Sequence, residues 1–218
     1  MNEIQGVKAI FDKIPISLFD QFFTIDYNSI DGTIEFLKKR DVRVIQQKKP
    51  GRANALKEGL EYATGDIIVN LSSDGNEDPI DIPKILKKFE EGFEMVTASR
   101  FMKGSKVDIS DDALRIRKVG NILCAVMVNM FWGSKITDTT NGLRGFTRNC
   151  LEVSKLDTYA YAENFQLSIR TAKLGLKITE IPTIEHPRIG GIKKAVTFGL
   201  IFDMIKVLIK EIWIGKNF

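Results

Sequence analysis

The sequence predicts an α/β fold in which helices flank a mostly parallel sheet. Short apolar runs alternate along the chain with longer segments of helical periodicity, as in repeated strand–helix–strand units. The clearest run, residues 67–71, follows a turn at residues 64–66 and precedes a polar loop at residues 72–76. An apolar run with these flanks is typical of a buried parallel strand, and ligands bind at the carboxyl ends of such strands.

Composition indicates one ordinary globular domain with enough apolar residues for a sizeable core. The chain has 218 residues, of which 44% are hydrophobic and 28% charged. Its net charge of +4 suits an anionic ligand or a membrane surface but is too weak to indicate nucleic acid. Cys124 and Cys150 form no disulfide framework and favour a reducing compartment. The only histidine, His186, excludes a histidine-cluster metal site and argues against a Ser-His-Asp triad.

The expected location is the cytoplasm, with peripheral attachment to the cytoplasmic membrane face left open. Residues 1–10 lack the basic stretch followed by an apolar stretch that marks a signal peptide. The longest uncharged run, residues 119–134, is short for a membrane span and predicts a buried or interfacial helix.

In the first half of the chain, strands and helices alternate. Apolar residues at positions 4, 7, 10 and 11 share one face of a helix that Pro15 ends. Strands are expected at residues 22–25, 42–45, 67–71 and 94–98. Helices are expected at residues 4–14, 33–37, 53–62 and 79–89.

The second half is less regular. We expect helices at residues 115–131, 162–173 and 196–213, a strand at residues 178–184, a turn-rich stretch at residues 137–146 and a basic loop at residues 188–194. Gly175 is a typical residue to end the second helix. In the last helix, Asp203, Lys206 and Lys210 share a narrow face, which leaves a wide apolar face.

Six segments, in the right order, resemble the motifs of glycosyltransferase family 2. They are residues 26–33 (DYNSIDGT), 50–59 (PGRANALKEG), 71–79 (LSSDGNEDP), 99–104 (SRFMKG), 138–146 (DTTNGLRGF) and 180–194 (EIPTIEHPRIGGIKK). Each motif alone is short, so the ordered set carries the resemblance. The most similar subgroup contains dolichyl-phosphate (polyprenyl-phosphate) mannosyl- and glucosyltransferases and bacterial cell-surface sugar transferases.

This resemblance implies a GT-A-like fold and an inverting sugar transfer. The donor would be a nucleotide-diphosphate-sugar, such as a UDP- or GDP-sugar, used with Mg²⁺ or Mn²⁺. The acceptor would be a polyprenyl phosphate or a cell-surface glycan. The transferase domain would comprise residues 1–194, and residues 195–218 would form a C-terminal amphipathic helix.

The resemblance also assigns roles to single residues. Asp26 would accept hydrogen bonds from the base or ribose of the nucleotide. Arg52 would lie near the donor phosphates at a helix N-terminus, with a solvated surface arginine as the alternative. Asp74 would ligate the metal that stabilises the leaving nucleotide diphosphate. Arg188 and Lys194 would close over the phosphates of donor or acceptor.

Three further residues have two readings each. Arg100 and Arg144 would also bind the donor, with salt bridges inside the fold as the alternative. Asp138 would lie near the sugar as a catalytic residue, with a cap or turn carboxylate as the alternative.

The chain departs from the family pattern at the metal loop. Ser72 replaces the first aspartate of that motif, so Glu77 or Asn76 would complete the metal site, or metal affinity would be low. Tyr27 replaces the second aspartate of the early motif, and Lys193 replaces the serine of the basic loop.

A second departure concerns the general base. Asn164 stands where many relatives have an aspartate that deprotonates an acceptor hydroxyl. A polyprenyl phosphate is already an anion and needs no base. Asn164 therefore favours a phosphate acceptor, or else Glu163 is the catalytic base.

A third departure is at the front. The family opens with a strand, whereas Asn2-Glu3 here resembles the end of the motif that follows it. We therefore expect a fold lacking its usual first strand, because the chain is truncated, because neighbouring strands close up, or because something else fills the gap. Nucleotide binding is expected to be impaired, since buried backbone groups would be unpaired.

The last helix suits attachment to a membrane surface through its apolar face, with Trp213 near its end. The alternative is packing on the sheet or on a second subunit of a homo-oligomer.

A competing function is a catalytically silent nucleotide-sugar-fold protein that acts as a binding or scaffolding partner. A Rossmann-type oxidoreductase is disfavoured, because no G-x-G-x-x-G follows a strand.

Overall fold

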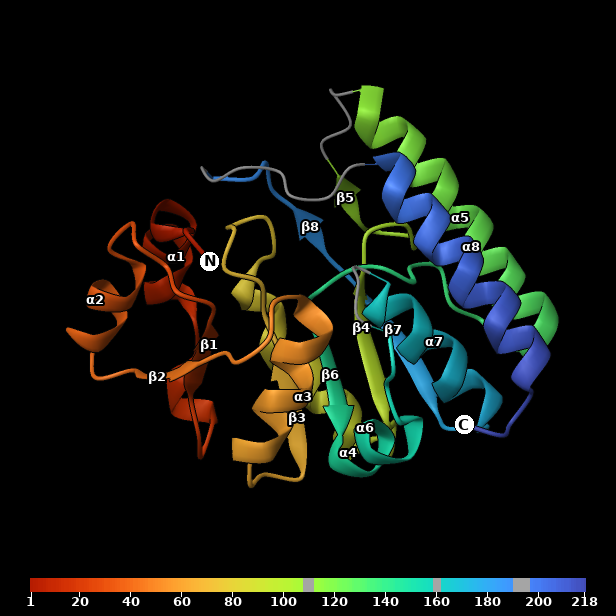
Figure 1. Ribbon diagram of the computed structural model, residues 1–218, viewed down its shortest axis with the longest axis horizontal. Coiled ribbons are helices and arrows are strands. Elements are labelled where there is room, and N and C mark those ends of the chain that lie inside the picture. Colours follow the sequence, from red (N-terminus) through yellow and green to blue (C-terminus); the bar gives the residue numbers. More distant parts are fainter. Residues whose placement is uncertain (108–111, 159–161, 190–196) are drawn as a thin grey trace.

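The computed structural model describes residues 1–107, 112–158, 162–189 and 197–218. A small unit at one side holds β1 (Phe23–Asp26) and β2 (Arg43–Gln46), which pair in parallel, with α1 (Ile4–Ile10) and α2 (Thr33–Lys38) beside them (Figure 1). Two short 3-10 helices, Phe11–Lys13 and Ile16–Leu18, connect α1 to β1.

The central sheet has the strand order β3-β6-β4-β7. Its strands are β3 (Ile67–Asn70), β6 (Arg144–Thr147), β4 (Met95–Ser99) and β7 (Ile178–Pro182). β4 and β7 are parallel, and β6 runs antiparallel to both of its neighbours. A third, two-stranded sheet pairs β5 (Lys106–Val107) with β8 (Ile184–Glu185).

β6 lies in the stretch that sequence patterning predicted to be turn-rich. Its residues Arg144 and Gly145 break the apolar alternation by which strands are recognised. The glycine is required by packing, because a Cβ there would lie 2.6 Å from side-chain atoms of Ile85 and Phe89 on α4 (Ile82–Glu90). β6 is therefore a strand because it pairs with β3 and β4 and packs against α4. These contacts cannot be recognised in the local sequence.

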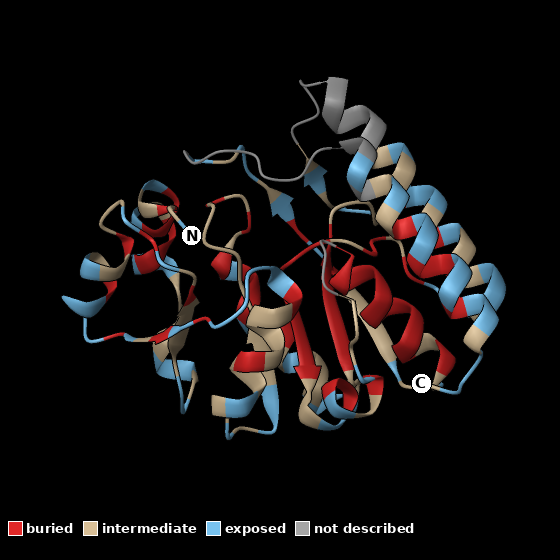
Figure 2. Ribbon diagram, viewed as in Figure 1, coloured by how far each residue is buried: buried red, intermediate tan, exposed pale blue. Residues whose placement is uncertain are grey.

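Helices cover the central sheet. They are α3 (Arg52–Tyr62), α4 (Ile82–Glu90), α6 (Arg148–Ser154) and α7 (Glu163–Lys173), with the 3-10 helix Pro79–Asp81 before α4. β4 is fully buried and nearly all of α7 is buried (Figure 2). The centre of the core therefore lies around β4 and α7.

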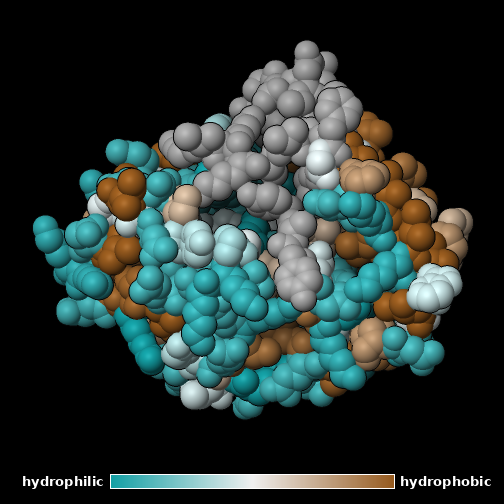
Figure 3. Space-filling view, in the orientation of Figure 1, coloured by the Kyte–Doolittle hydropathy of each residue, from teal (hydrophilic) through white to brown (hydrophobic). Residues whose placement is uncertain are grey.

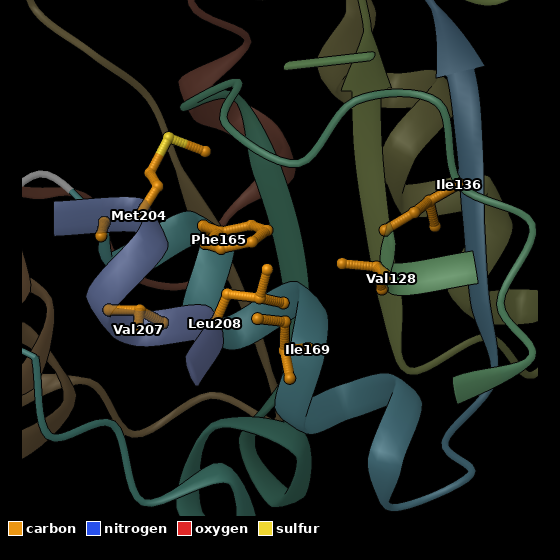
Figure 4. Close-up of a cluster of buried hydrophobic side chains, with 8 residues drawn as sticks. Val128, Ile136, Phe165, Ile169, Met204, Val207 and Leu208 are labelled. Carbon is orange, nitrogen blue, oxygen red and sulfur yellow. The ribbon is translucent and has the colours of Figure 1, made fainter. Parts of the chain in front are cut away.

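Two long helices, α5 (Asp112–Trp132) and α8 (Thr197–Ile214), lie side by side against α7 (Figure 1). Their contact is apolar: Val128 of α5, Phe165 and Ile169 of α7, and Met204 and Leu208 of α8 belong to one buried cluster (Figure 4). No helix in the described part of the chain is long and apolar enough to cross a bilayer.

α8 is also held by a buried charge cluster. Glu211 is fully buried and accepts hydrogen bonds from Arg170 Nε at 2.9 Å and Lys173 Nζ at 2.7 Å. Gln166 Nε2 donates to the same carboxylate at 2.9 Å. One face of α8 is therefore packed on α5 and α7, while its other face stays exposed.

The sheet is split between β1 and β3. Within the described residues β1 pairs with β2 alone and β3 with β6 alone, so the two edges are not joined. As a result β3 is not the buried strand that its apolar run predicts. Ile67 is 40% exposed and the other three residues of β3 are half-buried, because none of the described strands covers that edge.

Candidate active site

A cavity of about 1860 Å³ collects most of the residues proposed from the sequence. Its polar part lies at the carboxyl ends of β1 and β3 and at the first residues of α3 and α7. From there it extends between β1 and β3 and, in another direction, along apolar side chains of α5 and α8. Lys194 lies outside the described residues.

Asp74 and Arg188, which are 114 residues apart, meet at this cavity. The Asp74 Oδ2 atom accepts a hydrogen bond from Arg188 Nη1 at 3.0 Å. The same guanidinium contacts the carboxylate of Glu3. The loop can turn back here because Gly75 adopts a φ of +79°, a conformation that side-chain-bearing residues rarely adopt. The structure thus brings together two of the predicted site residues and adds Glu3 to them.

Glu77 holds the metal loop in place through Ser72. It is buried, and its two oxygens accept hydrogen bonds from Ser72 N at 2.7 Å and Ser72 Oγ at 2.9 Å. Burial raises the pKa of Glu77 to about 7; the charge of Arg52 opposes this shift and that of Asp74 adds to it. Ser72 and Glu77 therefore bind each other, and the geometry gives Glu77 a supporting position in place of the predicted metal contact.

The oxygens available for a metal are those of Asp74 and Asn76. Asn76 Oδ1 is buried and has no hydrogen-bond partner within the described part of the chain. No group of three or more His, Cys, Asp or Glu residues among the described ones could hold an ion by itself. Mg²⁺ and Mn²⁺ accept a site with one or two protein oxygens when ligand phosphates and water complete it. The residues present fit such a site.

Arg52 and Glu163 form an ion pair across the cavity. Each is the first residue of its helix, and Arg52 Nε lies 2.8 Å from Glu163 Oε1. Glu163 is only 3% exposed, and its Oε2 atom lacks a hydrogen-bond partner among the described residues. Arg52 is therefore ion-paired at the cavity. The Oε2 atom of Glu163 can accept a hydrogen bond there.

Asp26 lies at the cavity wall but is engaged locally. Its carboxylate accepts hydrogen bonds from Ser29 N at 2.7 Å and Ser29 Oγ at 2.6 Å. It thereby fixes the turn after β1. Its contact with a nucleotide stays a prediction.

Arg100 and Asp138 form a salt bridge inside the fold. Arg100 Nε and Nη2 donate to the two Asp138 oxygens at 2.7 and 3.0 Å, and Asn121 Nδ2 donates to Oδ1 at 2.7 Å. Burial acts to raise the pKa of Asp138, but Arg100 and the hydrogen bonds hold it below its usual range. Asp138, which is 1% exposed, is thus a buried turn carboxylate. Arg100 lies at the cavity wall, with its guanidinium paired to Asp138.

Arg144 does not reach the cavity, so its predicted donor contact is not supported. It is fully buried, and its guanidinium donates to the main-chain oxygens of Asn141 at 2.8 Å and Asn164 at 3.1 Å. Burial lowers its pKa to about 10, against the opposing charge of Asp138. The alternative reading, an internal structural arginine, describes it.

Sequence reasoning missed how the start of the chain is fixed. Asn2 N donates to Ser29 Oγ at 2.8 Å, and Ile4 N donates to Asp31 Oδ2 at 2.9 Å. Gly6 of α1 lies directly on the metal-loop backbone, since a Cβ there would be 2.3 Å from Ser73 O. The available signal was the D-x-x-S-x-D pattern of residues 26–31, whose short polar side chains bind nearby backbone.

Comparison with solved structures defines the class. Glucosyl-3-phosphoglycerate synthase from Mycobacterium tuberculosis, solved in complex with Mn²⁺, UDP-glucose and phosphoglyceric acid, is similar with a TM-score of 0.76 and 20% identity. The similarity covers 96% of this chain and 76% of that one. A complex of the same enzyme with Mg²⁺ and UDP also gives 0.76. The fold is therefore that of GT-A glycosyltransferases.

The family follows from sequence. A model of glycosyl transferase family 2 matches residues 7–153, about two thirds of the chain, and the chain belongs to that family. "Glycosyltransferase AglJ" of Haloferax volcanii is 27% identical over 192 residues, 87% of this chain and 62% of AglJ. "Dolichyl-phosphate hexose transferase" of the same organism is 28% identical over 169 residues, 76% of this chain and 70% of that protein. The chain thus spans under two thirds of the length of AglJ.

Proposed function

We propose that this chain transfers a sugar, with inversion, from a nucleotide-diphosphate-sugar to a polyprenyl phosphate. The observation that carries the proposal is the convergence of Asp74, Arg188, Arg52 and Glu163 on one cavity that continues into an apolar channel. The similar proteins support the two substrates separately: one was solved with UDP-glucose, and another is named a dolichyl-phosphate hexose transferase. A cell-surface glycan is the alternative acceptor.

Donor binding would use the polar end of the cavity. A divalent metal, when bound, neutralises charge that develops on the departing diphosphate, and Asp74 with Asn76 Oδ1 would hold it. Arg188 and Arg52 carry positive charge to the same place, and Arg52 stands at the helix N-terminus, where backbone amides favour anions. Asp26 would contact the nucleoside at the end of β1.

Acceptor binding would use the apolar end. Leu123, Cys124 and Met127 of α5 and Met204, Ile205 and Leu208 of α8 line the cavity there, next to Phe165. A prenyl chain in this channel would place its phosphate near Glu163 and Arg52. Because a phosphate is already an anion, Asn164 costs the reaction nothing, and Glu163 acts through Arg52 rather than as a base.

We also propose attachment to a membrane surface through α5 and α8. Both helices expose apolar residues, which form much of the brown surface in Figure 3. On α5 these include Val119, Leu123, Val126 and Met130, and on α8 they include Phe202, Ile205, Ile209 and Trp213. A surface helix of this kind lies in the lipid interface, close to a lipid acceptor. A homo-oligomer built on the same face is the alternative.

A catalytically silent binding protein is the second candidate. Two observations favour it: Ser72 has replaced a metal carboxylate and is bound to Glu77, and the sheet beside the donor site is split. A transferase consumes the nucleotide-sugar donor, whereas a silent binding protein leaves it intact.

The test is nucleotide release from a panel of UDP- and GDP-sugars with Mg²⁺ or Mn²⁺ in the presence of polyprenyl phosphate. The Asp74→Asn variant should lower release at least about 100-fold, a typical loss for a group that stabilises developing charge. The matched control is Asp78→Asn in the same loop, whose carboxylate caps the following 3-10 helix and which should retain release. Equal release by the Asp74→Asn variant, or none from any donor, contradicts the proposal.

A further inference from the structure

The loop that carries Asp74 is joined to the segment after β8 by main-chain hydrogen bonds on both sides of Arg188. His186 N donates to Asn76 O at 2.9 Å, and Ile189 N donates to Asp74 O at 3.0 Å. In Figure 1 the chain after β8 runs past this loop towards α1. The main chain of Arg188 is therefore held beside the loop.

The guanidinium of Arg188 bridges two carboxylates from distant parts of the chain. Its Nη1 atom donates to Asp74 Oδ2 at 3.0 Å, and its Nη2 atom contacts Glu3 Oε1. Arg188 and Asp74 are half-buried and Glu3 is buried. Hydrogen bonds between ionised groups are stronger than those between neutral groups, and water screens them less in such surroundings. Arg188 therefore occupies the cation position in front of Asp74.

Glu3 keeps the guanidinium in this position. The ion pair of its carboxylate within the described residues is with Arg188, and its buried Oε2 atom has no hydrogen-bond partner there. A buried carboxylate without a positive partner is costly. Withdrawal of Arg188 would leave Glu3 in that state, so the bridged arrangement is the favoured one in the ligand-free chain.

This arrangement engages the residue that the metal site needs. Asp74 Oδ2 accepts the bond from Arg188, and Asp74 Oδ1 accepts a long one from Asn76 N at 3.4 Å. The other oxygen of the site, Asn76 Oδ1, has no partner within the described part of the chain. A hard divalent cation needs carboxylate oxygens and repels a guanidinium beside it. Asp74 can therefore serve Arg188 or a metal, but not both.

We propose that Arg188 is the resting counter-ion of Asp74, anchored by Glu3, and that its guanidinium must swing away before Asp74 can ligate a metal. The main-chain bonds of His186 and Ile189 confine this change to the side chain. Arg188 therefore stays at the cavity after its release, with its charge available to another anion.

The consequence for the donor rests on the proposed function, which places metal and diphosphate at the same end of the cavity. A diphosphate offers the released guanidinium a new partner, because the planar fork of arginine matches phosphate oxygens. Donor binding would thus free Asp74 for the metal, and metal binding would free Arg188 for the donor. Each ligand raises the affinity of the other by the same factor. Without donor, the metal affinity of Asp74 is held down.

The test is the Mn²⁺ affinity of the full chain without nucleotide or sugar, measured by titration calorimetry and by the paramagnetic resonance signal of free Mn²⁺. The Arg188→Gln variant removes the guanidinium. The double variant Glu3→Gln with Arg188→Gln removes both charges of the pair, so the net charge around Asp74 is unchanged and no carboxylate is left unpaired. Lys118→Gln, at the α5 end of the same cavity, is the control for loss of one positive charge.

Both variants that lack Arg188 should bind Mn²⁺ at least about 10-fold more tightly than the wild-type chain, because a hydrogen bond between charged groups no longer competes. Lys118→Gln should bind Mn²⁺ as the wild-type chain does. Addition of Asp74→Asn to the double variant should remove the gain.

Three results would overturn the inference. The first is unchanged or undetectable Mn²⁺ binding in both variants that lack Arg188. The second is a gain in Arg188→Gln that the double variant lacks, since net charge alone would then explain it. The third is a gain that survives Asp74→Asn, because the metal would then bind elsewhere.

Amide hydrogen exchange tests whether the side chain alone moves. The amides of His186 and Ile189 should keep their protection when Mn²⁺ saturates the double variant or the wild-type chain. Loss of that protection would show that the whole segment leaves the loop, which contradicts a swing confined to Arg188.

Sugar transfer, measured separately, distinguishes this inference from the proposed function. Equal Mn²⁺ affinities in a chain that transfers sugar count against the counter-ion role alone. Tighter Mn²⁺ binding by the two variants of a chain that transfers no sugar supports the counter-ion role and counts against the transferase.

Discussion

At the scale of single residues, the site owes its arrangement to carboxylates that bind their own loops. Asp26 binds Ser29, Asp138 binds the backbone N–H of Thr140, and Glu77 binds Ser72. Asp74 and Glu163, by contrast, present their carboxylates to the cavity beside an arginine each. The charged residues of the site thus divide into those that fix its loops and those that present their charge to the cavity.

Glu77 should give the protein a pH-dependent stability. Its pKa is about 7 in the folded chain against 4.5 ordinarily. The folded state thus binds the proton more tightly, so the stabilisation is complete below pH 4.5 and is lost as pH rises through 7. At about 1.4 kcal/mol per pKa unit the loss is on the order of 3 kcal/mol.

The measurement is the urea midpoint at pH 5 and pH 8. The Glu77→Gln variant, which keeps an oxygen for the Ser72 N–H, should lose most of this dependence. Glu61→Gln, at an exposed position of α3, should retain it. An unchanged slope in Glu77→Gln would show that another group titrates.

Glu163 distinguishes the two acceptor classes. With a phosphate acceptor no base is needed, so the Glu163→Gln variant should lower the transfer rate by less than about 10-fold. With a hydroxyl acceptor the loss of a general base costs about 10²–10⁴-fold. Transfer rates to polyprenyl phosphate and to a glycan acceptor are measured for the wild-type chain and for Glu163→Gln. The size of the loss in the variant decides between the two acceptor classes.

At the scale of elements, α8 has two different faces. Its inner face carries Glu211 between Arg170 and Lys173, and its outer face carries exposed Ile209 and Trp213. One face fixes the helix to α7, and the other is available to a partner surface. Each face can be tested separately.

Removing the inner charge should destabilise the fold. In the Glu211→Ala variant two buried cations lose their shared counter-charge, which costs about 3–5 kcal/mol. Lys206→Ala, an exposed change on the same helix, should cost less than about 0.5 kcal/mol. Chemical denaturation measures both, and similar midpoints for the two variants would contradict the assigned role of the cluster.

Charging the outer face should weaken membrane attachment. The Ile209→Glu variant places a charge on the apolar surface and should lower binding to phosphatidylcholine–phosphatidylglycerol vesicles at least about 10-fold. Ile30→Glu is the matched control, because Ile30 is 89% exposed and lies outside this surface. Sedimentation of the wild-type chain as a dimer that Ile209→Glu dissociates would favour the oligomer instead.

At the scale of the whole molecule, the order of the motifs along the chain predicted more of the structure than local hydrophobic patterns did. The ordered motifs predicted the family and the GT-A fold, because spacing between motifs is preserved when single residues change. Local pattern missed β6, where Gly145 serves packing against α4, and it overstated the burial of β3.

Within the site, the sequence could not separate ligand-facing from structural charge. Arg144 and Arg188 are both arginines in motif positions, yet one is enclosed by main-chain carbonyls and the other lies at the cavity. That difference depends on how α7 and β6 pack, which no local window contains. The pairing of Arg52 with Glu163 likewise joins two helix starts that are 111 positions apart in the chain.

The most direct test of the account is transfer of labelled sugar into lipid. Labelled UDP- and GDP-sugars are incubated with polyprenyl phosphate in vesicles, with Mg²⁺ or Mn²⁺, using the chain and its Asp74→Asn variant. We expect label to enter the organic phase with one donor, and to fall at least about 100-fold in the Asp74→Asn variant. Label that stays in the aqueous phase with every donor, or that enters lipid equally well with the Asp74→Asn variant, would contradict the proposed transfer.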